Sequence, residues 1–188
     1  IILLAGTGIH GDKLLLLQQE LIGRASGISE EDLQKSKIIN TEAFELVKKA
    51  TNSDQVKKDI KELIKKSIKS DPEAKIPDGI SESEFISMQV SQITNPWMQF
   101  FIKYDPASTL EKVKCPVLAL NGDKDLQVPS KVNLDAINKA LAKGGNKKVT
   151  SKELPNLNHL FQECKTGATS EYGTIEQTIV NQLPRTLS

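Results

Sequence analysis

The sequence predicts an α/β protein built on a mostly parallel sheet, and three observations support this fold class. Three short segments, at residues 1–5, 116–121 and 148–154, have strand character, and the first reads as a buried parallel strand. Helical periodicity fills the intervals between them, and strands separated by helices usually run parallel and are joined by right-handed crossovers. The loops that follow the second and third runs carry an acid, Asp125, and a histidine, His159.

The first strand, residues 1–5, opens the sequence without a methionine or a basic leader. A chain that begins inside a strand is expected to be a fragment, and a mature N-terminus after processing is the alternative. The strand leads into Gly6-Thr-Gly8-Ile-His-Gly11, which matches the G-x-G-x-x-G pattern of dinucleotide-binding loops. Such a unit needs a second strand ending in an acid about 20 residues on. Here more helix follows, so the glycines are predicted to form a tight turn, with nucleotide binding as a minor alternative.

Residues 12–104 contain no convincing strand, and we expect a series of helices inserted between the first two strands. Asn95-Pro96 is a typical helix start, with asparagine as the cap and proline in the first turn. The only aromatic cluster of the chain follows it and consists of Trp97, Phe100 and Phe101. An insertion above a sheet edge often covers a binding site, so these three residues are candidates for a substrate pocket.

Residues 1–11 and 105–188 are predicted to form the α/β part. A helical pattern runs from Ser130 to about residue 142, between the second and third strands, and glycines end it. A last helix is expected over residues 175–183, where Ile175, Ile179, Val180 and Leu183 have helical spacing before Pro184.

Composition excludes several classes of protein. The formal net charge is +1, which argues against nucleic-acid binding because such proteins need a strongly basic face. No apolar run reaches the roughly 18 residues of a membrane span. Two cysteines are too few for a disulfide framework. Asp123 and Asp125 have no further ligand close in sequence, so we predict no metal site, and no motif predicts a cofactor. The sequence does not indicate a cellular compartment.

Asp125 and His159 have the chemistry of two members of a Ser-His-Asp site. One helix and one strand separate them, which places both in loops at the same edge of a parallel sheet. Neutral imidazole can take a proton from a hydroxyl near pH 7, and a buried carboxylate fixes its tautomer. Acid before histidine also matches the chain order Ser, Asp, His. A structural role for a lone loop histidine remains an alternative.

The third member is missing, because no Gly-x-Ser-x-Gly occurs in the 188 residues. Gly23-Arg-Ala-Ser-Gly27 comes nearest, but Ser26 is one position too late and no strand precedes it. Ser26 is therefore predicted to end a helix. Cys164 follows His159 closely, yet nothing around it in sequence would activate a thiolate.

Five segments carry a resemblance to a known family: residues 3–8, 11–20, 104–106, 115–129 and 156–161. They make the chain similar to the C-terminal part of an α/β-hydrolase, in the bacterial esterase and dienelactone-hydrolase-like branch that has an inserted helical cap. The resemblance implies that Asp125 is the acid and His159 the base of a catalytic triad. It also implies that the nucleophilic serine and the oxyanion donors lie upstream of Ile1.

By this resemblance the expected function is that of a serine hydrolase that cleaves small carboxylic esters through an acyl-enzyme, without a cofactor. This chain alone would lack the nucleophile and be inactive. The alternative is a non-catalytic α/β-hydrolase-like module that binds a ligand or a partner. In either case, missing neighbour strands would leave an apolar sheet edge, and we expect self-association through it.

Overall fold

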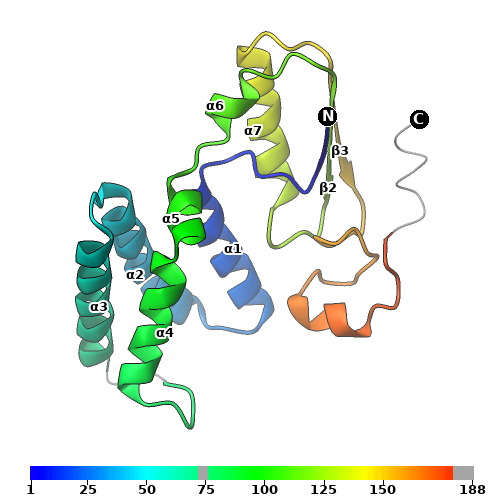
Figure 1. The fold of residues 1–188 in the computed structure, drawn as a ribbon. Coiled ribbons are helices and arrows are strands. Elements are labelled where there is room, and N and C mark those ends of the chain that lie inside the picture. Colours follow the sequence, from blue (N-terminus) through cyan, green and yellow to red (C-terminus); the bar gives the residue numbers. More distant parts are fainter. Residues whose placement is uncertain (72–75, 180–188) are drawn as a thin grey trace. The chain divides into compact units, whose positions relative to one another are not determined.

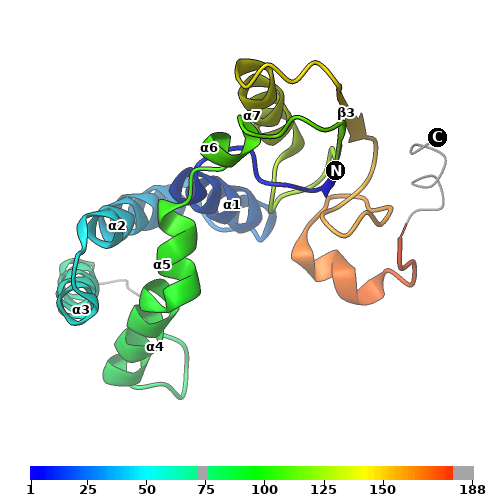
Figure 2. The ribbon, with the colours of Figure 1, turned by 45° about the horizontal axis from the view of Figure 1, so that its top comes forward.

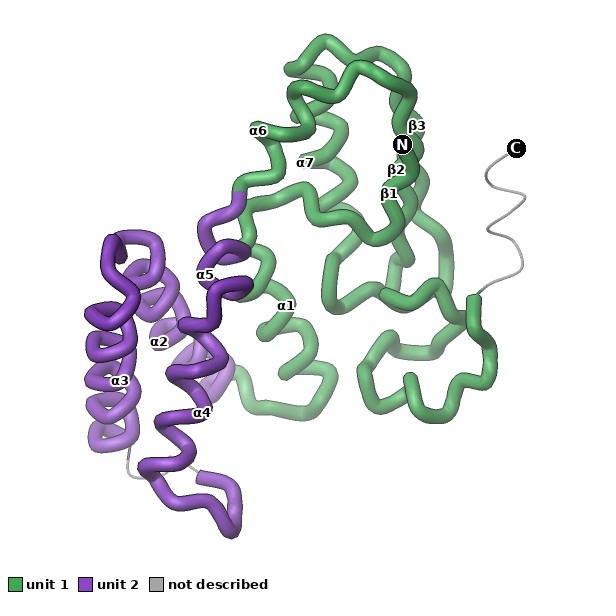
Figure 3. The backbone as a smooth tube through the Cα atoms, viewed as in Figure 1, with its two compact units in different colours: residues 1–30, 105–188 green, residues 31–104 purple. Residues whose placement is uncertain are grey.

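The computed structural model describes residues 1–71 and 76–179 and has a mixed α/β architecture (Figure 1). The chain divides into two compact units, coloured separately in Figure 3. The sheet unit consists of Ile1–Glu30 and the chain from Asp105 onward, and the helical unit consists of Glu31–Tyr104. Each unit is described by itself below.

The sheet has three strands, β1 (Ile2–Leu4), β2 (Val117–Gly122) and β3 (Val149–Leu154), in the order β1-β2-β3. Both pairings are parallel, and the register aligns Leu3 with Ala119 and Ala119 with Ser151. This confirms the predicted parallel sheet. Because all three strands run in the same direction, the loops that follow them leave from the same edge of the sheet.

Helix α7 (Ser130–Lys143) makes the crossover from β2 to β3 and lies along one side of the sheet in both Figure 1 and Figure 2. Its apolar residues repeat at helical spacing and pack on the β2 residues that face them. The short helix α6 (Ala107–Leu110), which precedes β2, contributes to the same cluster. The buried members of this cluster are Leu110, Val117, Ala119, Leu134, Ile137, Ala140 and Leu141.

The glycine-rich segment after β1 is a packing turn against α7. The Gly8 amide donates to Asn133 Oδ1 at 2.8 Å, and a Cβ at Gly8 would lie 2.2 Å from the Asn133 carbonyl oxygen. Only glycine can approach the helix this closely. Helix α1 (Gly11–Ala25) follows the turn. Residues 12–30 therefore group with the sheet unit, whereas the sequence analysis predicted that the helical insertion begins at residue 12.

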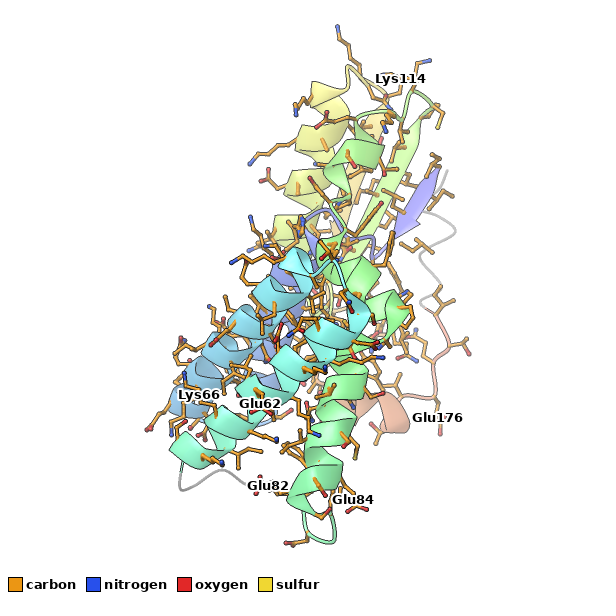
Figure 4. The ribbon with its side chains drawn as sticks, turned by 60° about the vertical axis from the view of Figure 1, so that its left-hand side comes forward. Glu62, Lys66, Glu82, Glu84, Lys114 and Glu176 are labelled. Atoms are coloured by element: carbon orange, nitrogen blue, oxygen red, sulfur yellow. The ribbon has the colours of Figure 1, made fainter. Side chains whose placement is uncertain are left out.

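The helical unit contains α2 (Glu30–Lys49), α3 (Ser53–Ser70), α4 (Glu82–Thr94) and α5 (Pro96–Lys103). Polar caps start three of them: Asn52 for α3, Ser81 with Glu84 for α4, and Asn95 for α5. Figure 4 shows charged side chains such as Glu62 and Lys66 on the exposed surface of α3. Among the described helices, none combines the length and apolar character needed to cross a bilayer.

The segment that follows β3 differs from the prediction. It contains a 3₁₀ helix, η1 (Thr169–Thr174), and residues 175–179 are not helical. Gln177 explains the difference: its carbonyl accepts from Gln162 Nε2 at 2.7 Å, and its side-chain oxygen accepts from the Glu163 amide at 2.8 Å. These contacts hold the chain against the β3 loop. Val180 and Leu183 lie outside the described residues.

Strand β1 leaves an apolar edge. It pairs with β2 alone among the described strands, and Ile1, Ile2 and Leu4 are 59, 54 and 50% exposed. An edge strand offers unpaired backbone groups to another strand, and apolar side chains strengthen such pairing. Self-association through this edge remains our expectation for the isolated chain.

We predict that substituting lysine at Ile2 or Leu4 shifts the isolated chain toward the monomer, because an edge lysine opposes strand pairing. Light scattering coupled to size exclusion measures the mass over a range of concentrations. Val132→Lys is the control, since Val132 is an exposed aliphatic residue on α7. A wild-type chain that stays monomeric at every concentration contradicts the prediction.

Candidate functional site

The loop after β2, called the acid turn below, is a tight turn that presents Asp125. The Asp125 amide donates to the Gly122 carbonyl at 3.2 Å, and the Asp123 amide donates to the Leu154 carbonyl of β3 at 3.0 Å. The first bond closes the turn, and the second continues the β2–β3 pairing into it. Asp125 is only 2% exposed, so its carboxylate is withdrawn from solvent and depends on protein donors.

Four donors surround the Asp125 carboxylate. Oδ1 accepts from the backbone amides of Gln127 and Val128, both at 2.8 Å. Oδ2 is 2.9 Å from His159 Nδ1 and 3.3 Å from Asn121 Nδ2, which donates to it. Contacts to both oxygens fix the plane of the carboxylate.

His159 is brought to Asp125 by the loop that follows β3, as the sequence analysis predicted from the topology. Since an ionised carboxylate can only accept, we assign the proton of the neutral imidazole to Nδ1. The second nitrogen, Nε2, then carries a free lone pair. The side chain of His159 is 27% exposed, whereas that of Asp125 is fully buried. This combination is the one that a general base requires.

The loop that follows β3 and carries His159, called the histidine loop below, is built around Asn158, which is fully buried. Asn158 Oδ1 accepts from the amides of Leu160 and Gln162, at 2.9 and 3.1 Å, and so closes the backbone on both sides of the histidine. Phe161, also buried, has φ of +58°. A bulky residue rarely adopts the left-handed conformation, so this loop is strained.

Backbone strain gathers at the same edge of the sheet. Three non-glycine residues in the described part of the chain have positive φ: Ala5, Asn156 and Phe161. Ala5 directly follows β1, and the other two lie in the β3 loop on either side of His159. Asparagine adopts this conformation readily, but alanine and phenylalanine do so under strain. Strained residues cluster at functional sites, where the surrounding structure holds them in place.

Gly122, the last residue of β2, allows the two loops to touch. A Cβ at this position would lie 2.1 Å from the Leu157 carbonyl oxygen. The same carbonyl accepts from the Lys124 amide at 3.1 Å, so the turn and the histidine loop are joined through their backbones. A side chain at residue 122 would push them apart.

Helix η1 adds a residue that the sequence analysis missed. Gln127 Nε2 donates to the Tyr172 hydroxyl oxygen at 3.1 Å, and the Gln127 amide is one of the donors to Asp125. Burial raises the pKa of Tyr172, and the Gln127 side chain opposes that rise. Nothing in the local pattern around Tyr172 indicates this long-range contact. Asn121 was missed as well, although a polar residue in an apolar strand is a recognisable signal.

The segment before η1 closes around Glu171. Its carboxylate accepts from the Thr166 hydroxyl at 2.8 Å and from the amides of Lys165, Thr166 and Gly167. The Thr166 hydroxyl, followed by these amides, lowers the pKa of Glu171. This cluster of hydrogen bonds folds residues 165–171 and so sets the position of Tyr172.

The predicted pocket aromatics belong to the helical unit. Trp97 and Phe101 stack with ring centroids 5.0 Å apart, and Phe100 stacks on Tyr104 at 5.5 Å. Trp97 and Phe100 are 62 and 63% exposed. The pairing explains the spacing of the cluster on α5 within this unit. A role of Trp97, Phe100 and Phe101 in a substrate pocket stays a prediction.

The other histidine forms a second imidazole–carboxylate pair. His10 Nδ1 lies 2.6 Å from Asp12 Oδ1, which also accepts from the Lys13 amide at 2.7 Å. The pair stands at the start of α1, where a carboxylate is favoured by the helix dipole. In the described residues, no cluster of three or more histidine, cysteine or acidic side chains could hold a metal ion.

We predict that Gly122→Ala destabilises the sheet unit by about 1–3 kcal/mol, the usual effect of overpacking. The added methyl group must displace the Leu157 carbonyl, which separates the histidine loop from the turn. Urea denaturation measures the loss. Gly173→Ala is the matched control, because a Cβ at residue 173 meets open space. Equal effects of the two substitutions contradict the prediction.

We predict that Glu171→Gln lowers stability at neutral pH and has little effect in acid. The pKa of Glu171 is lowered by folding, so its contribution is full above the unfolded value of about 4.3 and is lost as the pH falls through the lower folded value. Urea denaturation from about pH 7 to pH 3 measures both forms. Glu176→Gln, an exposed carboxylate labelled in Figure 4, is the control. A difference between wild type and Glu171→Gln that does not change with pH contradicts the assignment.

The chain was compared with protein-family models, with curated proteins and with solved structures, and none of the three comparisons found a match. Function must therefore be argued from the side chains at the carboxyl edge of the sheet and from the motifs of the sequence.

Proposed function

We propose that these residues form the acid-and-base part of a serine hydrolase that acts on carboxylic esters. The observation that carries the proposal is the 2.9 Å contact between His159 Nδ1 and the buried Asp125 carboxylate. It leaves Nε2 of a partly exposed imidazole free to accept a proton. The order of acid and histidine along the chain supports the same chemistry.

The serine comes from outside the 188 residues in this proposal. No Gly-x-Ser-x-Gly is present, and within the described residues no serine, threonine or cysteine side chain forms a hydrogen bond to the His159 ring. The resemblance to α/β-hydrolases suggests that a neighbouring strand carries it. Such a strand would pair with the open edge of β1, whose aliphatic residues are exposed.

The reaction then follows from the geometry. His159 Nε2 takes the hydroxyl proton as the serine oxygen attacks the ester carbonyl carbon, and the resulting imidazolium is stabilised by Asp125. The imidazolium returns this proton to the alkoxide oxygen as the alcohol leaves, giving an acyl-enzyme. Water attacks the acyl carbon with His159 again as base, and the carboxylic acid and free serine are released. In this scheme Asp125 takes up no proton, and its four hydrogen-bond contacts keep the carboxylate in place.

The first test uses this chain itself. Only two histidines are present, so His10→Gln leaves His159 as the single imidazole for ¹⁵N nuclear magnetic resonance. We expect the neutral ring to carry its proton on Nδ1, with Nε2 unprotonated. Asp125→Asn should weaken this tautomer preference, since the amide can donate as well as accept. A wild-type ring protonated mainly on Nε2 removes the basis of the proposal.

The second test uses a longer polypeptide that contains both these residues and a Gly-x-Ser-x-Gly. We expect labelling by a fluorophosphonate and hydrolysis of short acyl esters. His159→Gln and Asp125→Asn should lower kcat by about 10³–10⁴-fold, while His10→Gln should keep most of the activity. A correctly folded polypeptide that neither labels nor hydrolyses would favour a non-catalytic binding module.

A further inference from the structure

Asn121 is an unusual residue for its place in the fold. It follows the apolar residues of β2 and is itself fully buried, directly before Gly122. Parallel strands that are covered on both faces are normally apolar along their whole length. The side chain of a buried asparagine has two N–H donors and one acceptor oxygen, and each needs a protein partner because solvent is absent.

The amide nitrogen of Asn121 forms hydrogen bonds, but its side-chain oxygen does not. Its Nδ2 donates to the Val128 carbonyl at 2.6 Å and to Asp125 Oδ2 at 3.3 Å. Its Oδ1 is buried and accepts no hydrogen bond from any described residue. A buried acceptor without a donor is unfavourable for folding. The amide group is therefore not explained by the stability of the strand alone.

The Asn121 side-chain NH₂ group donates two hydrogen bonds to the acid turn. The Val128 carbonyl lies at the end of the turn, while its amide is bound to Asp125 Oδ1. Asp125 Oδ2 is the oxygen that faces His159. One NH₂ group thus contacts both the turn and the carboxylate oxygen that the imidazole uses.

We propose that Asn121 is a positioning residue that fixes the Asp125 carboxylate in the orientation that accepts the Nδ1 proton of His159. The inference rests on the proposed function, in which that tautomer makes Nε2 the base. Asn121 contacts neither substrate nor the reacting atoms in this scheme. Without its donor, Oδ2 has only the imidazole as partner, and the carboxylate can turn within the contacts made by Oδ1.

The ionisable groups on the elements near the pair are the same in every variant of the test. Asp123 and Lys124 lie on the acid turn, Cys164 follows the histidine loop, and Glu171 and Tyr172 belong to the η1 segment. Variants at residue 121 change none of these groups. A change at His159 can therefore be assigned to the loss of the Asn121 Nδ2 contacts with Asp125 Oδ2 and the Val128 carbonyl.

The test compares variants in the His10→Gln background by ¹⁵N nuclear magnetic resonance of His159. Asn121→Leu keeps the side-chain size without a donor, and Asn121→Ser provides a smaller second variant. We expect loss of the single Nδ1-protonated tautomer, a mixture of both tautomers, and faster exchange of the Nδ1 proton with water. The control is Asn146→Leu, since Asn146 is a buried asparagine that donates to two carbonyls, of Val113 and Cys115, away from the acid turn.

The outcomes separate the two proposals. A wild-type ring without the Nδ1 proton overturns the proposed function. A wild-type ring with it, and unchanged Asn121 variants, overturns only the role of Asn121. If both variants fail to fold, the Asn121 side-chain amide of the wild type is followed during titration. The inference requires the Asn121 amide resonances to shift over the pH range in which the His159 resonances shift, while those of Asn146 stay constant. Asn121 resonances that do not change together with those of His159 overturn the inference.

Discussion

The buried carboxylate of Asp125 is the group around which the carboxyl edge of the sheet is organised. A charge withdrawn from water is strongly unfavourable unless hydrogen bonds replace its hydration. Here four donors do so: two amides of the acid turn, the Asn121 side chain on β2 and the His159 ring on the β3 loop. One side chain thus joins a strand, its turn and a loop distant in sequence.

Close backbone approach makes this convergence possible. Gly122 lets the Leu157 carbonyl reach the acid turn, and Asn158 closes the histidine loop from inside. The left-handed residues Asn156 and Phe161 bend that loop around His159. The strain is tolerated because buried contacts of Phe161 and the Asn158 hydrogen bonds hold the loop from both sides.

Much of this arrangement could be predicted from the sequence, and the exceptions have physical reasons. Segments with strand character separated by helical patterns predict a parallel sheet, and a parallel sheet places Asp125 and His159 at one edge. Contacts formed across long intervals leave no local pattern, so the bond of Gln127 to Tyr172 could not be seen. The helix expected over residues 175–183 was wrong for Ile175 and Ile179, because Gln177 bonds to the histidine loop instead of a helical neighbour. Local periodicity contains no information on tertiary hydrogen bonds that compete with helix formation.

The two oxygens of Asp125 differ in the sequence distance of their partners, and this has a consequence for what each contact depends on. Oδ1 binds amides two and three residues away, a contact that closes a very short loop and loses little chain entropy. Oδ2 contacts His159, which is 34 residues away, so this contact closes a longer loop that contains α7 and β3. The acid turn can therefore form from local contacts, whereas the contact with the imidazole depends on the pairing of β3 with β2. A change that loosens this pairing is expected to separate His159 from Asp125 and leave the bonds of Oδ1 intact.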